Sequence, residues 1–219
     1  GPRTAADFPT AERHLAAGAS TEPAPPARPV DARVLSFFAA VALLGLGFQM
    51  HFALNSAPLY LRFAQPPQLD HLMPVFWVGF NLLIFPACRA NQRFGGIAVM
   101  TGGAVIGAMA AALAASAPSL EALVALQFMA GGAWAAVLMS AMTAAIAIGH
   151  TGREGAATGG LFALLALATL ARMAIVATQL NKDAGFSSLL PWLPGLAWAG
   201  AALLLAWLAL RPRAIASSP

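Results

Sequence analysis

Few side chains in this chain could do chemistry inside an apolar environment, and three of them stand within long apolar runs: Arg172, His51 and Gln127. Arg172 is set deep in the run ATGGLFALLALATLARMAIVATQL, and Gln127 begins the uncharged run QFMAGGAWAAVLMSAMTAAIAI. Each run has the roughly 20 residues that a helix needs to cross a bilayer. A charge kept inside such a segment marks a functional site by default. We therefore expect the function to centre on Arg172.

Arg172 is predicted to lie about 12 Å from the outer end of its helix. Thr169 and Gln179, three residues before it and seven after it, should share its helix face as a polar stripe. The stripe could bind an anionic substrate group, or Arg172 could pair with an acid outside this chain. The alternative is that the arginine stem snorkels to the outer headgroups. Because the outer flank is otherwise poor in basic residues, we favour the functional interpretation.

His51 and Asn55 are four residues apart, which predicts that they stack on one helix face. Pro58 follows and is expected to kink the outer end of the helix. By helix rise, His51 lies about 25 Å and Arg172 about 24 Å from the cytoplasmic ends of their helices. Gln127 lies about 12 Å from the outer side, so all three are predicted at about the same level. Histidine changes charge near neutral pH, so His51 could carry a coupling proton. A neutral histidine bonded to a neighbouring helix is the open alternative.

Two further side chains are candidates for a substrate path. Trp134 shares a face with Gln127, seven residues earlier, and could form a stacking wall or serve packing alone. Asn81 is expected to donate an interhelical hydrogen bond or to line a cavity.

Small residues and tryptophans predict how helices pack. Glycine and alanine allow close helix approach, and tryptophans of the last span are expected at the membrane interface or against lipid. The small residues are Gly102, Gly103, Gly107, Gly131, Gly132 and Ala135, and the tryptophans are Trp192, Trp198 and Trp207.

The composition indicates an integral membrane protein, all-α in fold class. The chain has 219 residues, of which 59% are hydrophobic and 9% charged, against about 25% charged in soluble domains. The net charge of +4 does not indicate nucleic-acid binding, because the basic residues are spread over membrane-flanking loops. The single cysteine, Cys88, excludes an intrachain disulfide. We expect no metal and no cofactor.

Three regions follow from the hydropathy pattern. Residues 1–32 are rich in Pro and Ala and predict a flexible cytoplasmic linker or tail. Residues 33–211 predict a six-helix transmembrane bundle, and residues 212–219 a short cytoplasmic tail. The six predicted spans are residues 34–61, 71–88, 95–116, 119–148, 156–181 and 189–210.

The distribution of basic residues predicts that both termini are cytoplasmic. On that side fall Arg3, Arg13, Arg28, Arg33, Arg89, Arg93, Arg153, Arg211 and Arg213. The opposite side has Arg62 and Lys182, and Arg172 lies inside. We expect a multi-pass protein of the bacterial inner membrane.

Polar content repeats along the spans in groups of three. The first span carries Gln49 with His51 and Asn55, the second Asn81, and the third almost nothing; the fourth and fifth are again polar and the sixth is dry. This pattern predicts two inverted three-helix repeats.

The pattern resembles the C-terminal half of a major facilitator superfamily (MFS) transporter. Residues 90–96 resemble a decayed form of that family's cytoplasmic G-x-x-x-D-R-x-G-R loop: Arg93 and Gly95 match, whereas Gln92 replaces the aspartate and Gly96 the second basic residue. The turn at residues 152–155 is similar to linkers in many bacterial members.

The resemblance implies a secondary active transporter that moves a small solute by alternating access, with an anionic substrate and proton coupling as options. MFS transporters have twelve helices, so we expect this chain, which begins with Gly1, to be a fragment or a half that needs a missing N-terminal six-helix half. A half alone would expose polar groups to lipid.

Two other classes compete with transport. A membrane enzyme such as an intramembrane protease needs a Gly-x-Ser-Gly-like turn with a histidine or a carboxylate pair at depth, and the spans have neither. A haem subunit needs paired axial histidines, yet only His51 is well inside a span. We therefore predict no enzymatic activity. A non-transporting MFS-like scaffold or assembly factor stays open as the alternative.

Overall fold

The computed structural model describes residues 31–149 and 154–210, and within these residues the chain forms helices and no strand. Six helical segments are long and apolar enough to cross a membrane, which confirms the six predicted spans. They are Ala32–Tyr60, Pro66–Phe94, Gly96–Ala115, Leu120–Ile148, Glu154–Ala177 and Leu193–Leu210. The predicted tails and the turn at residues 152–155 fall wholly or mostly outside the described residues.

The first span is not one uniform helix. It consists of α2 (Ala32–Phe48), a π-helical segment η2 (Gln49–Asn55) and α3 (Ser56–Tyr60). The Asp31 carboxylate caps the start by accepting from the Arg33 amide at 2.9 Å. Pro58 of α3 has no amide hydrogen to donate to the preceding turn, and the wider π turns end three residues before it, at Asn55. The irregularity expected at Pro58 is thus a π segment at the level of His51.

The second and third spans meet at a sharp turn. The second comprises the 3-10 turn η3 (Pro66–Gln68), α4 (Leu69–Leu72) and the long α5 (Pro74–Phe94). Gly95 has a φ of 83°, which a residue with a side chain rarely adopts. The chain then continues as α6 (Gly96–Ala115).

The last three spans are α7 (Leu120–Gly149), α8 (Glu154–Ala177) and α10 (Leu193–Leu210). Between α8 and α10 lie the 3-10 turn η4 (Leu180–Lys182) and the short α9 (Ala184–Leu189). Helix α8 ends before the predicted residue 181, because Gln179 adopts a left-handed conformation with a φ of 59°.

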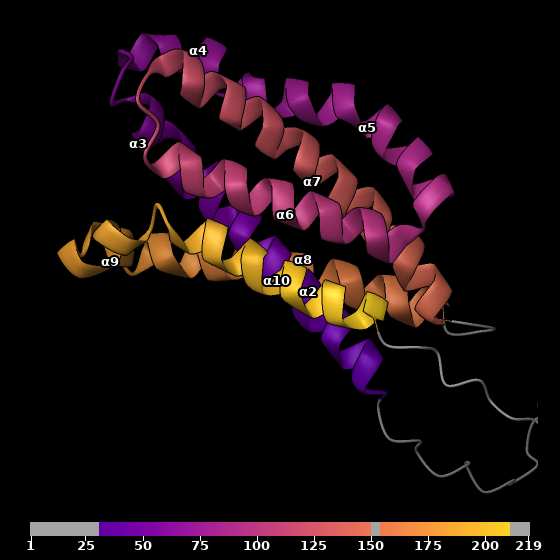
Figure 1. Ribbon diagram of the computed structural model, residues 1–219. Coiled ribbons are helices and arrows are strands. Elements are labelled where there is room, and N and C mark those ends of the chain that lie inside the picture. Colours follow the sequence, from indigo (N-terminus) through magenta and orange to yellow (C-terminus); the bar gives the residue numbers. More distant parts are fainter. Residues whose placement is uncertain (1–30, 150–153, 211–219) are drawn as a thin grey trace, which may run out of the picture. The chain divides into compact units, whose positions relative to one another are not determined.

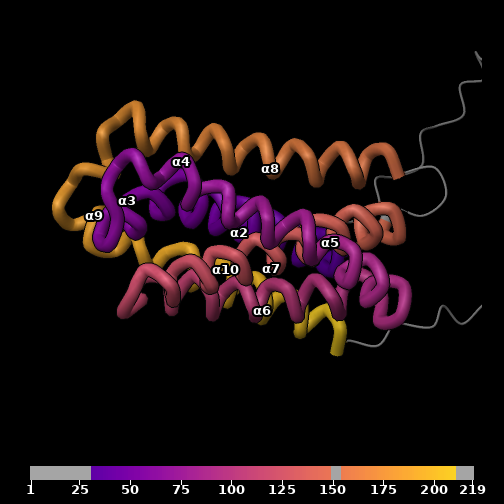
Figure 2. Tube along the Cα trace, turned by 90° about the horizontal axis from the view of Figure 1, so that it is seen from above, coloured from indigo at the N-terminus to yellow at the C-terminus, as the bar shows by residue number. Residues whose placement is uncertain are grey.

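The helices pack in a continuous order around α7 and α2. Helix α7 packs against α5, α6 and α8, whereas α10 packs against α6 and α2, and α2 also packs against α8. The start of α2 and the end of α10 lie at the same end of the bundle (Figure 1), where Arg33 Nη2 donates to the Leu208 carbonyl at 3.3 Å. Helices α3, α4 and α9 lie together at the opposite end (Figure 2).

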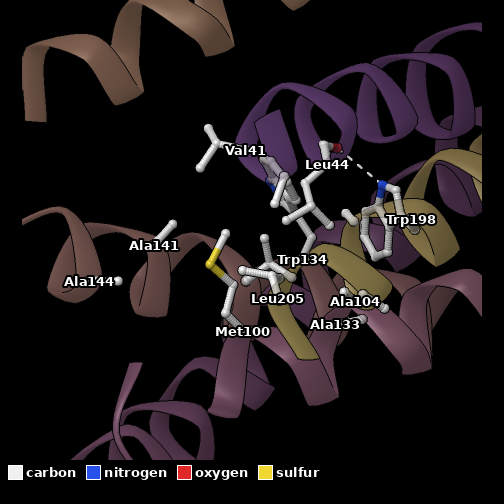
Figure 3. Close-up of a cluster of buried hydrophobic side chains, with 14 of the residues drawn as sticks. Val41, Leu44, Met100, Ala104, Ala133, Trp134, Ala141, Ala144, Trp198 and Leu205 are labelled. Carbon is white, nitrogen blue, oxygen red and sulfur yellow. Dashed lines mark hydrogen bonds between the residues drawn. The ribbon is translucent and has the colours of Figure 1, made fainter. Parts of the chain in front are cut away.

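The core lies where α2, α6, α7 and α10 meet. Trp134, Trp198 and Leu205 are buried there with Met100 (Figure 3). Trp198 Nε1 donates to the Leu44 carbonyl at 3.1 Å. The prediction that Trp198 faces the membrane interface or lipid is therefore wrong, since its side chain is 3% exposed.

Trp198 is buried because two helices leave room for its ring. A Cβ atom added at Gly47 of α2 or at Gly107 of α6 would overlap the indole. Trp192, in contrast, precedes α10 and is 47% exposed. The burial of Trp198 thus depends on glycines of two neighbouring helices. Its position in the last span alone does not predict it.

Helices α5 and α7 touch through their backbones. A Cβ atom at Gly79 would overlap the Phe128 carbonyl, and one at Gly131 would overlap the Phe76 carbonyl. This confirms the prediction that Gly131 allows close approach. The same prediction is wrong for Gly102, where an added Cβ atom would meet nothing within 4 Å.

Candidate functional site

The centre of the candidate site is a buried polar network between the π segment and α7. His51 Nε2 lies 3.1 Å from Gln127 Oε1, and Gln127 Nε2 donates to Ser56 Oγ at 3.1 Å. The Ser56 hydroxyl donates in turn to the His51 carbonyl at 3.0 Å. All three side chains are at most 3% exposed. The predicted common level of His51 and Gln127 is confirmed by this direct contact.

The bond to Gln127 places a proton on Nε2 of His51, because the Gln127 oxygen can only accept. The Nδ1 atom is buried without a hydrogen-bond partner among the described residues. His51 is thus a hydrogen-bonded histidine with one unpartnered ring nitrogen.

Asn55 takes part in a different contact. Its Nδ2 atom donates to the Leu190 carbonyl, between α9 and α10, at 2.8 Å. His51 and Asn55 are both buried and bond to different neighbours, His51 to α7 and Asn55 to the segment between α9 and α10. Both residues belong to the π segment.

The π segment also contacts α8. Gln49 Nε2 donates to Thr169 Oγ1 at 2.9 Å, and Thr169 itself donates to the Leu165 carbonyl at 3.1 Å. The seven residues of the segment thus make side-chain hydrogen bonds to α7, to α8 and to the chain between α9 and α10. A local departure from α-helical geometry with so many polar contacts is typical of functional positions in membrane helices.

Arg172 lies one helical turn beyond Thr169. It is five residues from the last residue of α8, Ala177, or about 7.5 Å along the helix. The end of its helix is therefore closer to Arg172 than the predicted 12 Å. Among the described residues its Nε atom is buried and has no hydrogen-bond partner, and no carboxylate lies in the interior of a span.

The side of α8 that carries Arg172 faces the bundle. Leu161 and Ala168 on this side are buried, and Leu165 packs against Gly45 of α2. Arg172 continues the same stripe four residues after Ala168 and is half-buried. The arginine thus leaves α8 toward the inside of the protein, on the stripe that packs against the first span.

Gln179 does not belong to this stripe. It lies beyond the end of α8, is exposed, and bonds to the Val176 carbonyl at 3.2 Å. Its left-handed backbone turns the chain toward η4. The predicted stripe of Thr169, Arg172 and Gln179 is therefore wrong at Gln179, because the helix ends before the heptad is complete.

Trp134 is part of an aromatic cluster. Its ring stacks on Phe48 with a centroid distance of 4.3 Å and an interplanar angle of 2°, and it lies 6.1 Å from the ring of Trp198. It is 5% exposed. This position agrees with the packing alternative, and Phe48 occupies the face that a stacked substrate would need.

Asn81 lies on the exposed face of α5. Its Nδ2 atom donates to the Trp77 carbonyl of the same helix at 2.7 Å. The expected interhelical bond is thus not formed within the described chain. Asn81 points away from the six helices, beside the exposed Leu82.

An open crevice occupies the end of the bundle where the described chain begins and ends. Its volume is about 890 Å³, and Asp31, Arg33, Gly95, Thr143 and Trp207 are among its lining residues. It is therefore framed by the ends of α2, α5, α7 and α10. Neither in this crevice nor anywhere else in residues 31–149 and 154–210 do three His, Cys, Asp or Glu side chains gather closely enough to hold a metal ion.

Sequence reasoning missed Ser56 and the Leu190 carbonyl. In the sequence, Ser56 resembles any small residue near a helix end. It joins the network because the π turn brings its hydroxyl to the His51 carbonyl, five residues before it. The available signal was the polar cluster directly before Pro58. The Leu190 carbonyl has no sequence signal, since it is a backbone group of a connecting segment.

The fold and the site together define a multi-pass integral membrane protein with an all-helical membrane domain. Comparison with known proteins adds no closer class: no protein-family model matches the chain, and no curated protein or solved structure is detectably similar to it.

Proposed function

We propose that this chain is the C-terminal half of a secondary active transporter of the MFS type, which moves a small solute by alternating access. The observation that carries the proposal is the buried network of His51, Gln127 and Ser56 on a π-helical break, with the unpaired Arg172 on a neighbouring helix. Irregular backbone and buried polar groups within membrane spans are features of transport sites.

The packing order of the helices supports two inverted repeats. If the first three spans are matched to the last three, α2 corresponds to α7, α5 to α8, and α6 to α10. The contact of α2 with α8 then corresponds to that of α7 with α5, and the contact of α2 with α10 to that of α7 with α6. Three spans per repeat reverse the membrane orientation of the second repeat, as inverted repeats require.

The proposed partner is a further six-helix half. Helix α8 buries little of its surface within the chain, and Phe162, Leu167 and Leu170 are all more than half exposed. Helix α5 likewise exposes Asn81 beside apolar side chains. A polar amide and a half-buried arginine would be poorly solvated by lipid alone, so a second half would cover both helices.

The roles of the site residues follow from their chemistry. Arg172 would attract an anionic group of the solute, because no protein carboxylate neutralises the positive charge of its guanidinium group. His51 would take up and release the coupling proton at its free Nδ1 atom. The proposed setting is the bacterial inner membrane, with the end that carries Arg33, Arg89 and Arg93 in the cytoplasm.

The test is pH-gradient-driven uptake of a panel of organic anions and neutral solutes into proteoliposomes containing the full-length protein or this half with its partner half. Arg172→Ala should abolish uptake of an anion that the wild type transports, whereas Lys182→Ala, which removes an exposed cation from the same side, should not. His51→Ala should remove the dependence on the pH gradient, and His71→Ala, at an exposed position on α4, should retain it.

Unchanged uptake in Arg172→Ala would mean that the arginine only anchors α8 at the outer headgroups. The second candidate function, a non-transporting scaffold or assembly factor, is favoured if no solute moves although every variant is folded. The dense aromatic packing around Trp134 is the observation in its favour, since that packing leaves no room for a solute against the indole.

A further inference from the structure

A second feature of the surface is an apolar groove between α5, α6 and α7. Its volume is about 410 Å³, and every residue that lines it is apolar. Leu83 and Pro86 of α5 form one wall, Ile106 belongs to α6, and Met129 to α7. The groove does not include any residue of the His51 network.

Small residues on α6 and α7 create the groove. Gly102 and Gly132 are among its lining residues. A Cβ atom at Gly102 would meet nothing within 4 Å, so the space above this glycine is open. At Gly132, in contrast, the Leu83 side chain already fills the position of a Cβ atom. The groove floor is thus at Gly102.

The length of the groove fits one membrane leaflet. Along α6 it extends from Ala98, near the start of the helix, to Ile106, which is about 12 Å of helix. Half of a hydrocarbon layer of about 30 Å is about 15 Å. The groove therefore runs from the headgroup level to about the middle of the bilayer, in the direction of a lipid acyl chain.

Positive charge stands at the mouth of the groove. Phe94 lines the groove at the end of α5, and the Arg93 guanidinium carbon lies 5.3 Å from the centre of its ring. Arg89 is one turn earlier on the same helix, and both arginines are exposed. Neither α5 nor α6 contains an acidic residue. An anionic group at this level would thus meet two guanidinium groups without competition from carboxylates of these helices.

We propose that this groove binds an anionic phospholipid of the cytoplasmic leaflet, with one acyl chain along Gly102 and the phosphate at Arg93 and Arg89. The apolar lining fits the acyl chain, and the arginines select the charge of the headgroup. The site is independent of the proposed transport function, since it requires only that the helices cross a membrane with the end that carries Arg89 and Arg93 in the cytoplasm.

The experiment is native mass spectrometry of the full-length protein released from micelles that contain equimolar phosphatidylglycerol and phosphatidylcholine. The wild type should retain one phosphatidylglycerol in preference to phosphatidylcholine. Gly102→Leu places a side chain in the groove without overlapping the backbone and should reduce lipid retention about tenfold. Gly159→Leu is the matched control, because a Cβ atom at Gly159 on α8 also meets open space.

Arg93→Gln tests the headgroup separately from the chain. It should remove the preference for phosphatidylglycerol while a lipid is still retained, and Lys182→Gln, at the opposite end of the bundle, should keep the preference. Equal retention in Gly102→Leu and wild type would overturn the proposal. Equal retention of the two lipids by the wild type would overturn it as well, because the arginines would then select nothing.

Discussion

The imidazole of His51 and the amide of Gln127 face each other at 3.1 Å between the first and fourth spans, although they are 76 positions apart in the chain. Gln127 holds the network together, since it accepts from His51 and donates to Ser56.

Gln127→Leu should therefore destabilise the fold. The change leaves the His51 N–H group buried without an acceptor, which costs about 1–2 kcal/mol in a membrane protein. The free energy of unfolding, measured in bicelles, checks this. Gln179→Leu is the control and should change little, because Gln179 is exposed and bonds only to its own turn. Equal stability of the two variants would contradict the network.

Two glycine substitutions should have opposite effects. Gly131→Ala places a methyl group against the Phe76 carbonyl, so α5 and α7 must separate, at a cost of about 1–3 kcal/mol. Gly102→Ala meets open space and should be neutral or stabilise α6 by up to about 1 kcal/mol. Thermal unfolding of both variants in the same detergent compares them. A stable Gly131→Ala protein would show that the two backbones are not in contact.

Substitutions of Trp198 and Trp192 should also differ in their effect on the free energy of unfolding. Trp198→Ala removes a buried ring and its bond to Leu44, which should cost about 3–5 kcal/mol. Trp192→Ala removes a half-exposed ring and should change the free energy of unfolding by less than about 1 kcal/mol. Tryptophan fluorescence adds a second readout, since the loss of Trp192 should remove the more solvent-accessible emission.

The orientation can be tested by labelling with a membrane-impermeant maleimide in a Cys88→Ala background. Gln92→Cys, exposed at the end of α5, should react only after permeabilisation of the cells. Lys182→Cys, exposed in η4 at the opposite end, should react in intact cells. The reverse result would place both termini outside and would contradict the assignment from the arginine distribution.

The spans could be predicted from sequence because hydropathy and length alone decide whether a helix can cross a membrane. It was also predictable that His51 and Gln127 lie at the same level, since helix rise converts a sequence position into a distance along the helix. The partner of Asn55 was not, because the Leu190 carbonyl is a backbone group 135 positions later in the chain. The π segment was not predicted either, since no local sequence pattern signals it.

Arg172 and Trp198 illustrate the same limit. The distance from Arg172 to the end of its helix was overestimated, because nothing local in the run up to Gln179 signals the left-handed turn that ends α8. Trp198 was assigned to the surface because a tryptophan in a peripheral span is usually an interface residue. Its burial depends on Gly47 and Gly107 of two other helices.

The glycine contact between α5 and α7 also determines which parts of this protein can move relative to one another. At these two glycines no side chain separates the backbones, so α5 and α7 cannot be brought closer together, and the close packing links their positions. Helix α8 meets α2 through the Leu165 side chain and meets η2 through the hydrogen bond from Gln49 to Thr169. Of the six spans, α8 buries the smallest share of its residues, so a displacement of α8 would break few packing contacts and would carry Arg172 with it.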